Sequence, residues 1–297
     1  MANEGAVWKD FVGYGKETTW GTKVVPTAWA RFRGGFDFVH KAEHIRLSGT
    51  DELRSYVKFV RGNISAEGSI SDLELLPDHF GLLLEAALGS VNGSVYKVKH
   101  GGLPSLSVEV SHGGLLHEYV GTKISSLEIS AEAGGLLRAS TSFVGRLGRD
   151  LASAETRSYS SKEPFVCHGV TLTWGGSTIR AQTATVRIEN PLRYPFWEMG
   201  DIYSAESTEG VAEITGEFRA IFDSTAEFDD FIAGTERTLV ISGQNTAGDT
   251  IEIKMGTVRL KDFSRDRGDQ NWDQTLSFEA IYNDSDGSPI VVTITTV

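Results

Sequence analysis

The same strand-to-helix pattern occurs twice in the sequence, at a constant offset in numbering of 148 (216 − 68 and 228 − 80). The segment GSISDLELLPDHF runs from Gly68 to Phe80, and its counterpart GEFRAIFDSTAEF runs from Gly216 to Phe228. A repeat of this kind indicates that one supersecondary unit has been used twice. Because a domain commonly contains ~100–150 residues, the chain of 297 residues has room for two such units, each with its own core.

A second pair of matches follows at an offset of 135 (256 − 121 and 277 − 142). A Gly-Thr pair begins at Gly121 and at Gly256, and a Ser-Phe pair begins at Ser142 and at Ser277. The offset decreases by 13 (148 − 135), which indicates an insertion of that length in the first copy alone. The turn-rich segment VNGSVYKVKHGGLP, which follows the first helical stretch, is the place where such an insertion is least costly.

We therefore predict two tandem domains, 1–155 and 156–297, connected by the polar stretch DLASAETRSYSSKEP. Each domain should be mainly β, a sandwich or barrel with one flanking α-helix. The segments SLSVEVS (105–111), IEIKM (251–255) and TLSFEAIY (275–282) alternate apolar with polar residues, which is typical of half-buried antiparallel strands. The 33 glycines beside only 7 prolines fit many short strands joined by turns.

Two stretches have helical spacing of their apolar residues and end at a glycine, which predicts helices over 78–88 and 225–233. We expect each helix to pack its apolar face against a sheet. The side chains predicted to do this are Phe80, Leu84, Phe228 and Ile232.

Composition argues against several classes of function. Forty acidic and 28 basic residues give a net charge of −12, which disfavours tight binding to phosphate backbones. No apolar run approaches the ~20 residues that cross a bilayer, so no membrane partner is expected. The first residues lack the basic and apolar segments of an export signal, and the single cysteine, Cys167, fits a reducing compartment. We expect assembly in a host cytoplasm.

The sequence contains no pattern that predicts catalysis, a cofactor or a metal. GYGKET is similar to a phosphate-binding loop, but Glu17 follows the lysine where Ser or Thr is needed. His112 and His117 lack the spacing of a zinc motif, and the acidic turn 283–287 lacks the terminal glutamate of a calcium loop. We therefore expect a protein that is not an enzyme.

Four segments, taken in order, resemble the family of phage tail tube proteins: GYGKETTWGTKVVPT, LELLPDHFGLLLEAALG, LPSLSVEV and YVGTKISSLEISAEAGGLLRASTSFVGR. The resemblance implies a structural virion protein whose tube domains assemble sideways into rings and vertically into a hollow tube. It also implies that strands from all subunits join into one barrel around the lumen through which the genome is ejected. Closing a barrel removes exposed strand edges.

With six tube domains in a ring of such a family and two in this chain, three chains would close a ring with pseudo-sixfold symmetry. If residues 165–297 were instead a decorating domain, six chains would be needed. The expected partners are other copies of the chain, other tail proteins at the tube ends, and viral DNA that passes without sequence-specific contacts. The resemblance favours a non-contractile, siphovirus-like tail.

One long segment, 190–209, is unusually aromatic for a loop. Its aromatic side chains either fold back on their own domain or anchor a contact between rings, since aromatic residues and Met are enriched at the centres of protein contacts. We expect the contact between rings, with a shorter counterpart at 48–56. The residues concerned are Tyr194, Phe196, Trp197, Met199 and Tyr203 in the long loop, Arg54 and Tyr56 in its counterpart, and Trp20 in the N-terminal arm.

The alternative function is a carbohydrate-binding or adhesive module built from two β-sandwiches. Such a module would also be rich in β structure, acidic and free of catalytic motifs. It should remain monomeric and expose a shallow aromatic platform, whereas a tube subunit should form rings or filaments.

Overall fold

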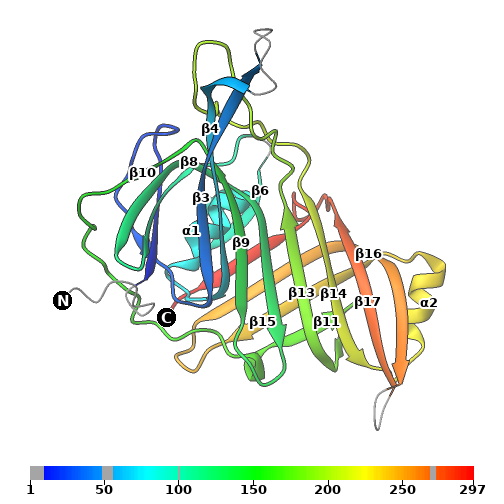
Figure 1. The fold of residues 1–297 in the computed structure, drawn as a ribbon. Coiled ribbons are helices and arrows are strands. Elements are labelled where there is room, and N and C mark those ends of the chain that lie inside the picture. Colours follow the sequence, from blue (N-terminus) through cyan, green and yellow to red (C-terminus); the bar gives the residue numbers. More distant parts are fainter. Residues whose placement is uncertain (1–9, 49–55, 100, 268–271) are drawn as a thin grey trace.

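The computed structural model describes residues 10–48, 56–99, 101–267 and 272–297. These residues form a mainly β protein, as predicted, in which 18 strands are connected through antiparallel pairings and two α-helices lie against the sheets (Figure 1). Neither helix is long and apolar enough to cross a membrane.

The first half of the chain contains ten strands and one α-helix among its described residues. They are β1 (Phe11–Lys16), β2 (Ala28–Trp29), β3 (Phe32–Ser48), β4 (Tyr56–Glu74), α1 (Phe80–Leu88), β5 (Gly89–Asn92), β6 (Val95–Val98), β7 (Leu106–His112), β8 (Leu115–Glu132), β9 (Arg138–Gly145) and β10 (Leu147–Asp150).

The second half contains eight strands, one α-helix and a short 3-10 helix among its described residues. They are η2 (Cys167–Gly169), β11 (Thr171–Trp174), β12 (Ser177–Ile179), β13 (Ala181–Glu189), β14 (Glu213–Ile221), α2 (Ala226–Ala233), β15 (Arg237–Gln244), β16 (Thr250–Arg267), β17 (Trp272–Ile281) and β18 (Val291–Thr295).

Seven strand pairings of the first half recur in the second half with the same partners in the same order, and one of them is β1·β2, which corresponds to β11·β12. The other six, β1·β7, β7·β8, β8·β9, β4·β9, β3·β4 and β8·β10, correspond to β11·β15, β15·β16, β16·β17, β14·β17, β13·β14 and β16·β18. The hairpin of β5 and β6 has no counterpart, because α2 ends at Ala233 and β15 begins already at Arg237. It occupies the place where the sequence predicts an insertion.

A repeated β-bulge sets how the long strands β8 and β16 correspond. The bulge lies between Ile124 and Ser126 in β8, and between Leu260 and Asp262 in β16. The structural offset is therefore 136 in these strands (260 − 124), whereas the Gly-Thr pairs predict 135. That prediction is wrong by one position, because each Gly-Thr pair lies beside a second irregularity where glycine occupies a different position in the two copies.

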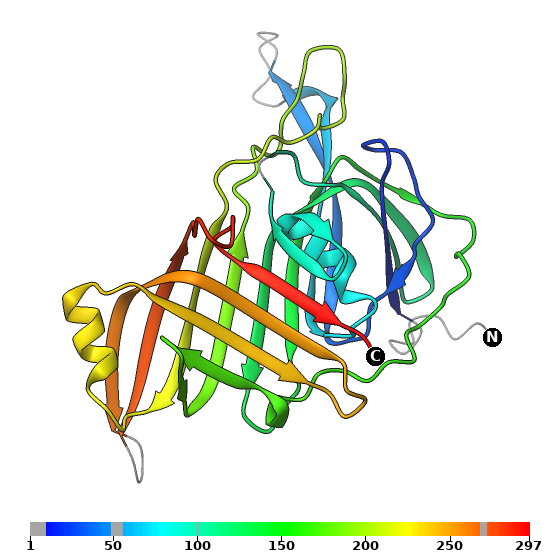
Figure 2. The same cartoon turned by 180° about the vertical axis from the view of Figure 1, so that it is seen from behind.

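The two halves are joined into one curved inner sheet. Thr183–Glu189 of β13 pairs with Ser126–Glu132 of β8, so the inner strands follow the order β3, β4, β9, β8, β13, β14, β17, β16. In the outer layer, β6 pairs with β18. Figures 1 and 2 show the inner sheet as a continuous wall, with α1 on its outer side at the joint between the halves. The predicted boundary at 155/156 stays a prediction.

The two helices differ in burial. On α1, Phe80 is 1% exposed and Leu84 is fully buried. On α2, Phe228 is half-buried against Phe263, with ring centroids 5.2 Å apart. Ile232 is 68% exposed, so the prediction that Ile232 packs in a core is wrong for the single chain. The second half supplies no strand or hairpin, among its described residues, that covers this face of α2 in the way that Tyr96 of β6 covers α1.

Strand β7 also differs from its prediction. Both of its faces are buried, including Ser107 and Glu109, which the alternating pattern placed toward solvent. Two other segments cover this second face: the Val24 amide of the N-terminal segment donates to Ser107 Oγ (3.0 Å), and the Glu155 amide of the stretch between the halves donates to Glu109 Oε1 (3.0 Å). Burial raises the pKa of Glu109. The alternating pattern therefore predicted the strand, but it did not predict that other segments cover its polar face.

Candidate functional site

The inner sheet has an unpaired strand edge at each of its two ends, β3 at one end and β16 at the other (Figure 1). Strand β3 pairs with β4 on one side only, and the Asp262–Arg267 part of β16 pairs only with β17. Within the described residues, no strand lies against the other edge of either one. Most side chains along both edges are exposed, among them Val39. Unpaired edges of this length are templates for pairing with another chain.

The face of the inner sheet that points away from the cores is polar. Hydroxyl side chains such as Ser69, Ser142, Thr185 and Ser277 line two shallow hollows on it. Its basic side chains are held by acidic ones, in the pairs Arg187 with Glu128, Lys41 with Glu67, and Lys261 with Glu279. The hydrogen bond and charge of Glu128 raise the pKa of Arg187. Each of these three basic side chains therefore has an acidic partner on the same face of the sheet.

The ends of β3 and β4 form a hairpin that projects from the sheet (Figure 1). Both of its faces expose large apolar side chains. Ile45 lies opposite Val60 on one face, and on the other face Phe59, which is 60% exposed, lies 6.5 Å from Tyr56 between ring centroids. Arg46 stacks over the ring of Tyr56 at 5.3 Å. Predicted contact residue Arg54 lies outside the described residues.

The long loop predicted to contact another ring lies against the first half of its own chain. Ile64 of β4 exchanges backbone hydrogen bonds with this loop, donating to Ile202 O (2.7 Å) and accepting from the Ser204 amide (3.0 Å). Tyr194 Oη donates to Ala66 O (2.5 Å), and Trp197 Nε1 reaches Ile64 O at 3.5 Å. Figures 1 and 2 both show the loop beside the projecting hairpin.

The remaining predicted residues of this region are divided between contact and solvent. Arg146 lies over the rings of Trp20 (5.1 Å) and Tyr203 (5.6 Å), so these two predicted residues come together around one guanidinium. Phe196 lies under Arg193 at 4.4 Å. Met199 is fully exposed at the tip of the loop. The structure thus brings Trp20 and Tyr203 together and leaves Met199 outside the cluster.

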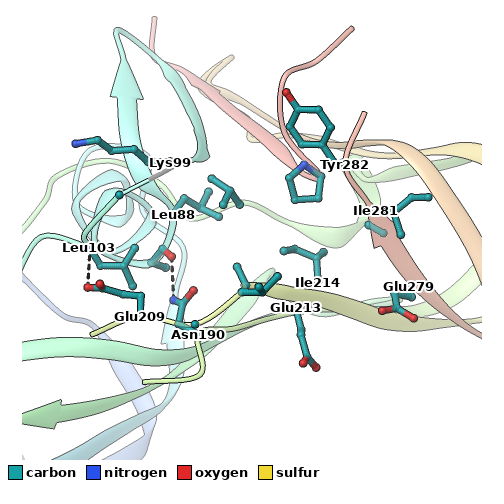
Figure 3. A pocket seen from close by; sticks show the side chains of 18 of the residues that line it. Leu88, Lys99, Leu103, Asn190, Glu209, Glu213, Ile214, Glu279, Ile281 and Tyr282 are labelled. Atoms are coloured by element: carbon teal, nitrogen blue, oxygen red, sulfur yellow. Dashed lines mark hydrogen bonds between the residues drawn. The ribbon is translucent and has the colours of Figure 1, made fainter. Parts of the chain in front are cut away.

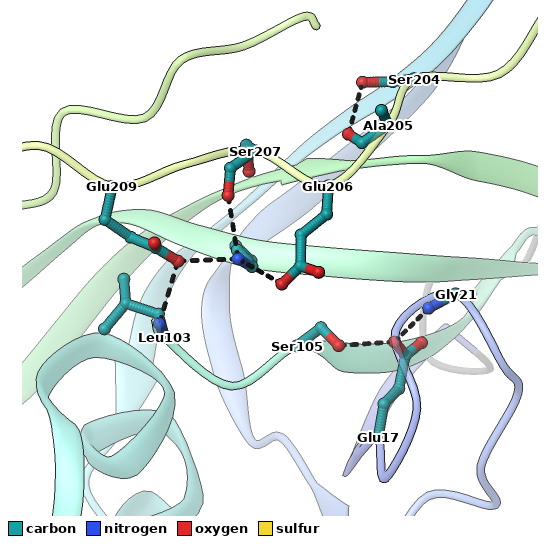
Figure 4. A network of polar contacts seen from close by, with 10 residues as sticks. Glu17, Gly21, Leu103, Ser105, Ser204, Ala205, Glu206, Ser207 and Glu209 are labelled. Atoms are coloured by element: carbon teal, nitrogen blue, oxygen red, sulfur yellow. Dashed lines mark hydrogen bonds and ion pairs between the residues drawn. The ribbon is translucent and has the colours of Figure 1, made fainter. Parts of the chain in front are cut away.

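A buried lysine fixes the end of this loop to β8 (Figure 4). The side chain of Lys123 is 2% exposed, and its ammonium donates to Glu206 (2.9 Å), to Glu209 (2.7 Å) and to the carbonyl of Ser207 (2.9 Å). Glu209 also accepts from the Leu103 amide (2.9 Å). Burial opposes its charge, but Lys123 and this amide together hold the pKa of Glu209 below its ordinary value.

Sequence reasoning missed Lys123, because a lysine in the middle of an alternating strand resembles one that points to solvent. It also missed the role of Glu17, which is buried directly after the end of β1 (Figure 4). The carboxylate of Glu17 accepts hydrogen bonds from Ser105 Oγ (2.7 Å), Ser107 Oγ (2.8 Å) and the Gly121 amide (2.8 Å). Nothing in the GYGKET segment itself predicted this burial, because the three donors lie 88, 90 and 104 residues further along the chain.

A groove of about 1130 Å³ lies at the joint between the halves (Figure 3). Leu88 and Leu103 form one wall, and Ile214 and Ile281 form the other. Asn190 also lines the groove, and its side-chain amide donates to Ala87 O (2.9 Å). The groove is mainly apolar and contains no convergent set of catalytic groups among its lining residues.

The candidate metal residues are not arranged as a metal site. His112 and His117 lie near each other, with ring centroids 5.8 Å apart, and His40 completes a cluster of imidazole rings. Within the residues that the structure describes, no group of three His, Cys, Asp or Glu side chains could hold a metal ion. Cys167 is half-buried, and its burial raises the pKa of its thiol.

A family model described as phage tail tube protein matches residues 9–295, nearly the whole chain. No curated protein matches the chain.

Proposed function

Because the chain belongs to the phage tail tube protein family, we propose that three copies close a ring and that stacked rings form the tube through which the viral genome is ejected. Membership in the family makes the protein a structural component of the virion tail. The observation that carries the proposal is the pair of unpaired edges, β3 and β16, at opposite ends of a curved sheet. Joining one edge to the other in successive copies closes a barrel and removes both edges.

The polar face of the inner sheet becomes the wall of the lumen in such a ring. Its lysines and arginines are engaged by carboxylates, as in the pair Arg187 and Glu128. DNA affinity rises with each phosphate that a basic side chain neutralises. A wall of hydroxyl groups and neutralised bases, in a chain of net charge −12, therefore lets DNA pass without holding it.

Stacking between rings is assigned to the end of the molecule where the hairpin of β3 and β4 and the loop 190–209 project together. The hairpin carries exposed Phe59 and Tyr56, which are suited to anchor a contact because buried aromatic side chains dominate the energetics of interfaces. The loop supports the hairpin from one side through Trp197. We therefore propose that the hairpin, rather than the loop expected from the sequence, is the main stacking element.

The test is negative-stain microscopy together with mass measurement of the purified chain. The parent protein should form stacked rings with three chains each. Tyr56→Ser combined with Phe59→Ser should leave rings but prevent long tubes, because it removes exposed anchors without touching the cores. The matched variant, Phe196→Ser with Trp197→Ser, should weaken tubes less, since its side chains contact their own chain.

Six chains per ring would overturn the assignment of a tube domain to each half. A chain that stays monomeric at every concentration would favour the adhesive or carbohydrate-binding module instead. Tubes of normal length from the Tyr56→Ser, Phe59→Ser variant would remove the hairpin from the stacking contact.

A further inference from the structure

The chain contains a template for the contact between neighbouring copies. Its two halves meet where β13 pairs with β8, and this joint aligns Arg187 with Glu128 and Glu189 with Ser126. Strand β3 occupies in the first half the position that β13 occupies in the second, since both pair with the strand that precedes a helix. Strand β16 occupies the position of β8. The two free edges are therefore the unpaired equivalents of the two strands that are paired inside the chain.

The structure fixes both offsets that are needed to transfer this register. Phe38 lies opposite Gly68, and Val186 lies opposite Gly216, so the offset between β3 and β13 is 148 (186 − 38). The repeated bulge gives an offset of 136 between β8 and β16, as from Ser126 to Asp262 (262 − 126). No free choice remains in the alignment of the two edges.

We propose that β3 of one chain pairs antiparallel with β16 of a second copy, with Val39 opposite Ser264 and Lys41 opposite Asp262. This register deepens the proposed ring and rests on it. It follows from the internal pairs Arg187 with Glu128 and Glu189 with Ser126, by subtraction of 148 on one side and addition of 136 on the other.

The chemistry of the two edges fits this register on the lumen side. Lys41 and Asp262 are both exposed and have opposite charges, and directly opposed charges stabilise a strand pair. Val39, which is 44% exposed, would be covered by the neighbouring strand. One pair opposes closure, because Asp37 meets Asp266.

On the other side of the joined sheet, His40 meets Phe263 and Phe38 meets Arg265. Arg265 already lies over the rings of Phe228 (4.9 Å) and Phe263 (4.9 Å). An aromatic layer of α2 and β16 is thus continued by the aromatic side chains of β3.

The register can be tested by disulfide trapping in a Cys167→Ala background. Val39→Cys with Ser264→Cys places two thiols directly opposite each other in different chains, where Cβ atoms are close enough for a disulfide after a small adjustment. Mild oxidation should convert rings into covalent trimers on a denaturing gel without reductant. The control Val39→Cys with Asp266→Cys places the thiols diagonally and should react about tenfold more slowly.

Each outcome decides between the register and the ring. Covalent trimers that form fastest with Ser264→Cys support the proposal, provided that the reduced variant assembles like the parent in micrographs. Rings that cross-link faster through Asp266→Cys overturn the register and leave the ring intact.

If the reduced cysteine variant stays monomeric while the parent forms rings, the charge reversal Lys41→Asp with Asp262→Lys is used instead. In that case, rings lost in each single change and restored in the double change support the register, and no restoration overturns it. A parent chain that forms no ring overturns both proposals.

Discussion

Replacing Lys123 tests whether the buried ion cluster holds the long loop on the first half. Lys123→Met keeps the length of the side chain but leaves the carboxylate of Glu209, which is 19% exposed, beside an apolar group. Removing one partner of a buried ion pair typically destabilises a protein by ~3–5 kcal/mol. At ~2–4 °C per kcal/mol for a domain of this size, the melting temperature of the unassembled chain should fall by about 6–20 °C, as measured by circular dichroism.

The repeat supplies the matched control. Arg259 occupies in β16 the position that Lys123 occupies in β8, but its side chain is 59% exposed and its partner Glu236 lies at 3.3 Å. An exposed pair of this kind contributes ~0–1 kcal/mol, so Arg259→Met should melt close to the parent. Lys123→Met with Glu209→Gln should recover part of the loss, because the unpaired carboxylate is gone. Equal melting temperatures for Lys123→Met and Arg259→Met would refute the reasoning.

Two further predictions concern the cores and pH. Phe80→Ala should reduce the free energy of unfolding by ~3–5 kcal/mol, because transfer and cavity terms add. Phe228→Ala should reduce it clearly less in the single chain, since Phe228 is only half-buried. Urea titration of both variants measures the two losses, and equal losses contradict the prediction. Burial, together with the charge of His117, lowers the pKa values of His40 and His112 in the folded chain, with Asp10, Asp37 and Asp150 acting in the opposite direction. The unfolded chain therefore takes up protons first as the pH falls, so stability is fully present above the ordinary histidine pKa of ~6.5 and decreases below it. The double change His40→Gln with His112→Gln should make the urea midpoint depend less on pH between pH 7.5 and pH 5. An unchanged dependence would show that these two histidines are not its cause.

Much of the fold could be predicted from the sequence, because its strands and helices follow local patterns and these patterns occur twice in the chain. The segment after Pro77 and the one before Gly234 became the two helices, which begin within two residues of the predicted positions. Burial of Ile232 could not be predicted in the same way. The burial of a helix face depends on which distant segment covers it, and the hairpin that covers α1 has no counterpart near α2 in the described part of the chain.

The candidate site was predictable in part for the same reason. An aromatic loop such as 190–209 is visible in the sequence, but its contact with Ile64 depends on how the two halves are joined, which no local pattern encodes. Tyr56 was predicted as a contact residue but Phe59 was missed, because a short apolar run such as YVKFVR (56–61) is equally typical of a buried strand. The buried charge of Lys123 likewise depends on three acceptors that lie far away along the chain, in the other half of the sequence.

In the three-chain ring proposed above, the hairpin of β5 and β6 would make the two kinds of joint mechanically unequal. Within a chain, the inner pairing of β8 with β13 is backed by an outer pairing of β6 with β18. Between chains of the proposed ring the outer layer would have no such bridge, because α2 leads directly to β15, and β10, the equivalent of β18, pairs only with β8 in the described part of the chain. Strong and weak seams would then alternate around the wall, so outward pressure from within the tube should open it along three lines rather than six.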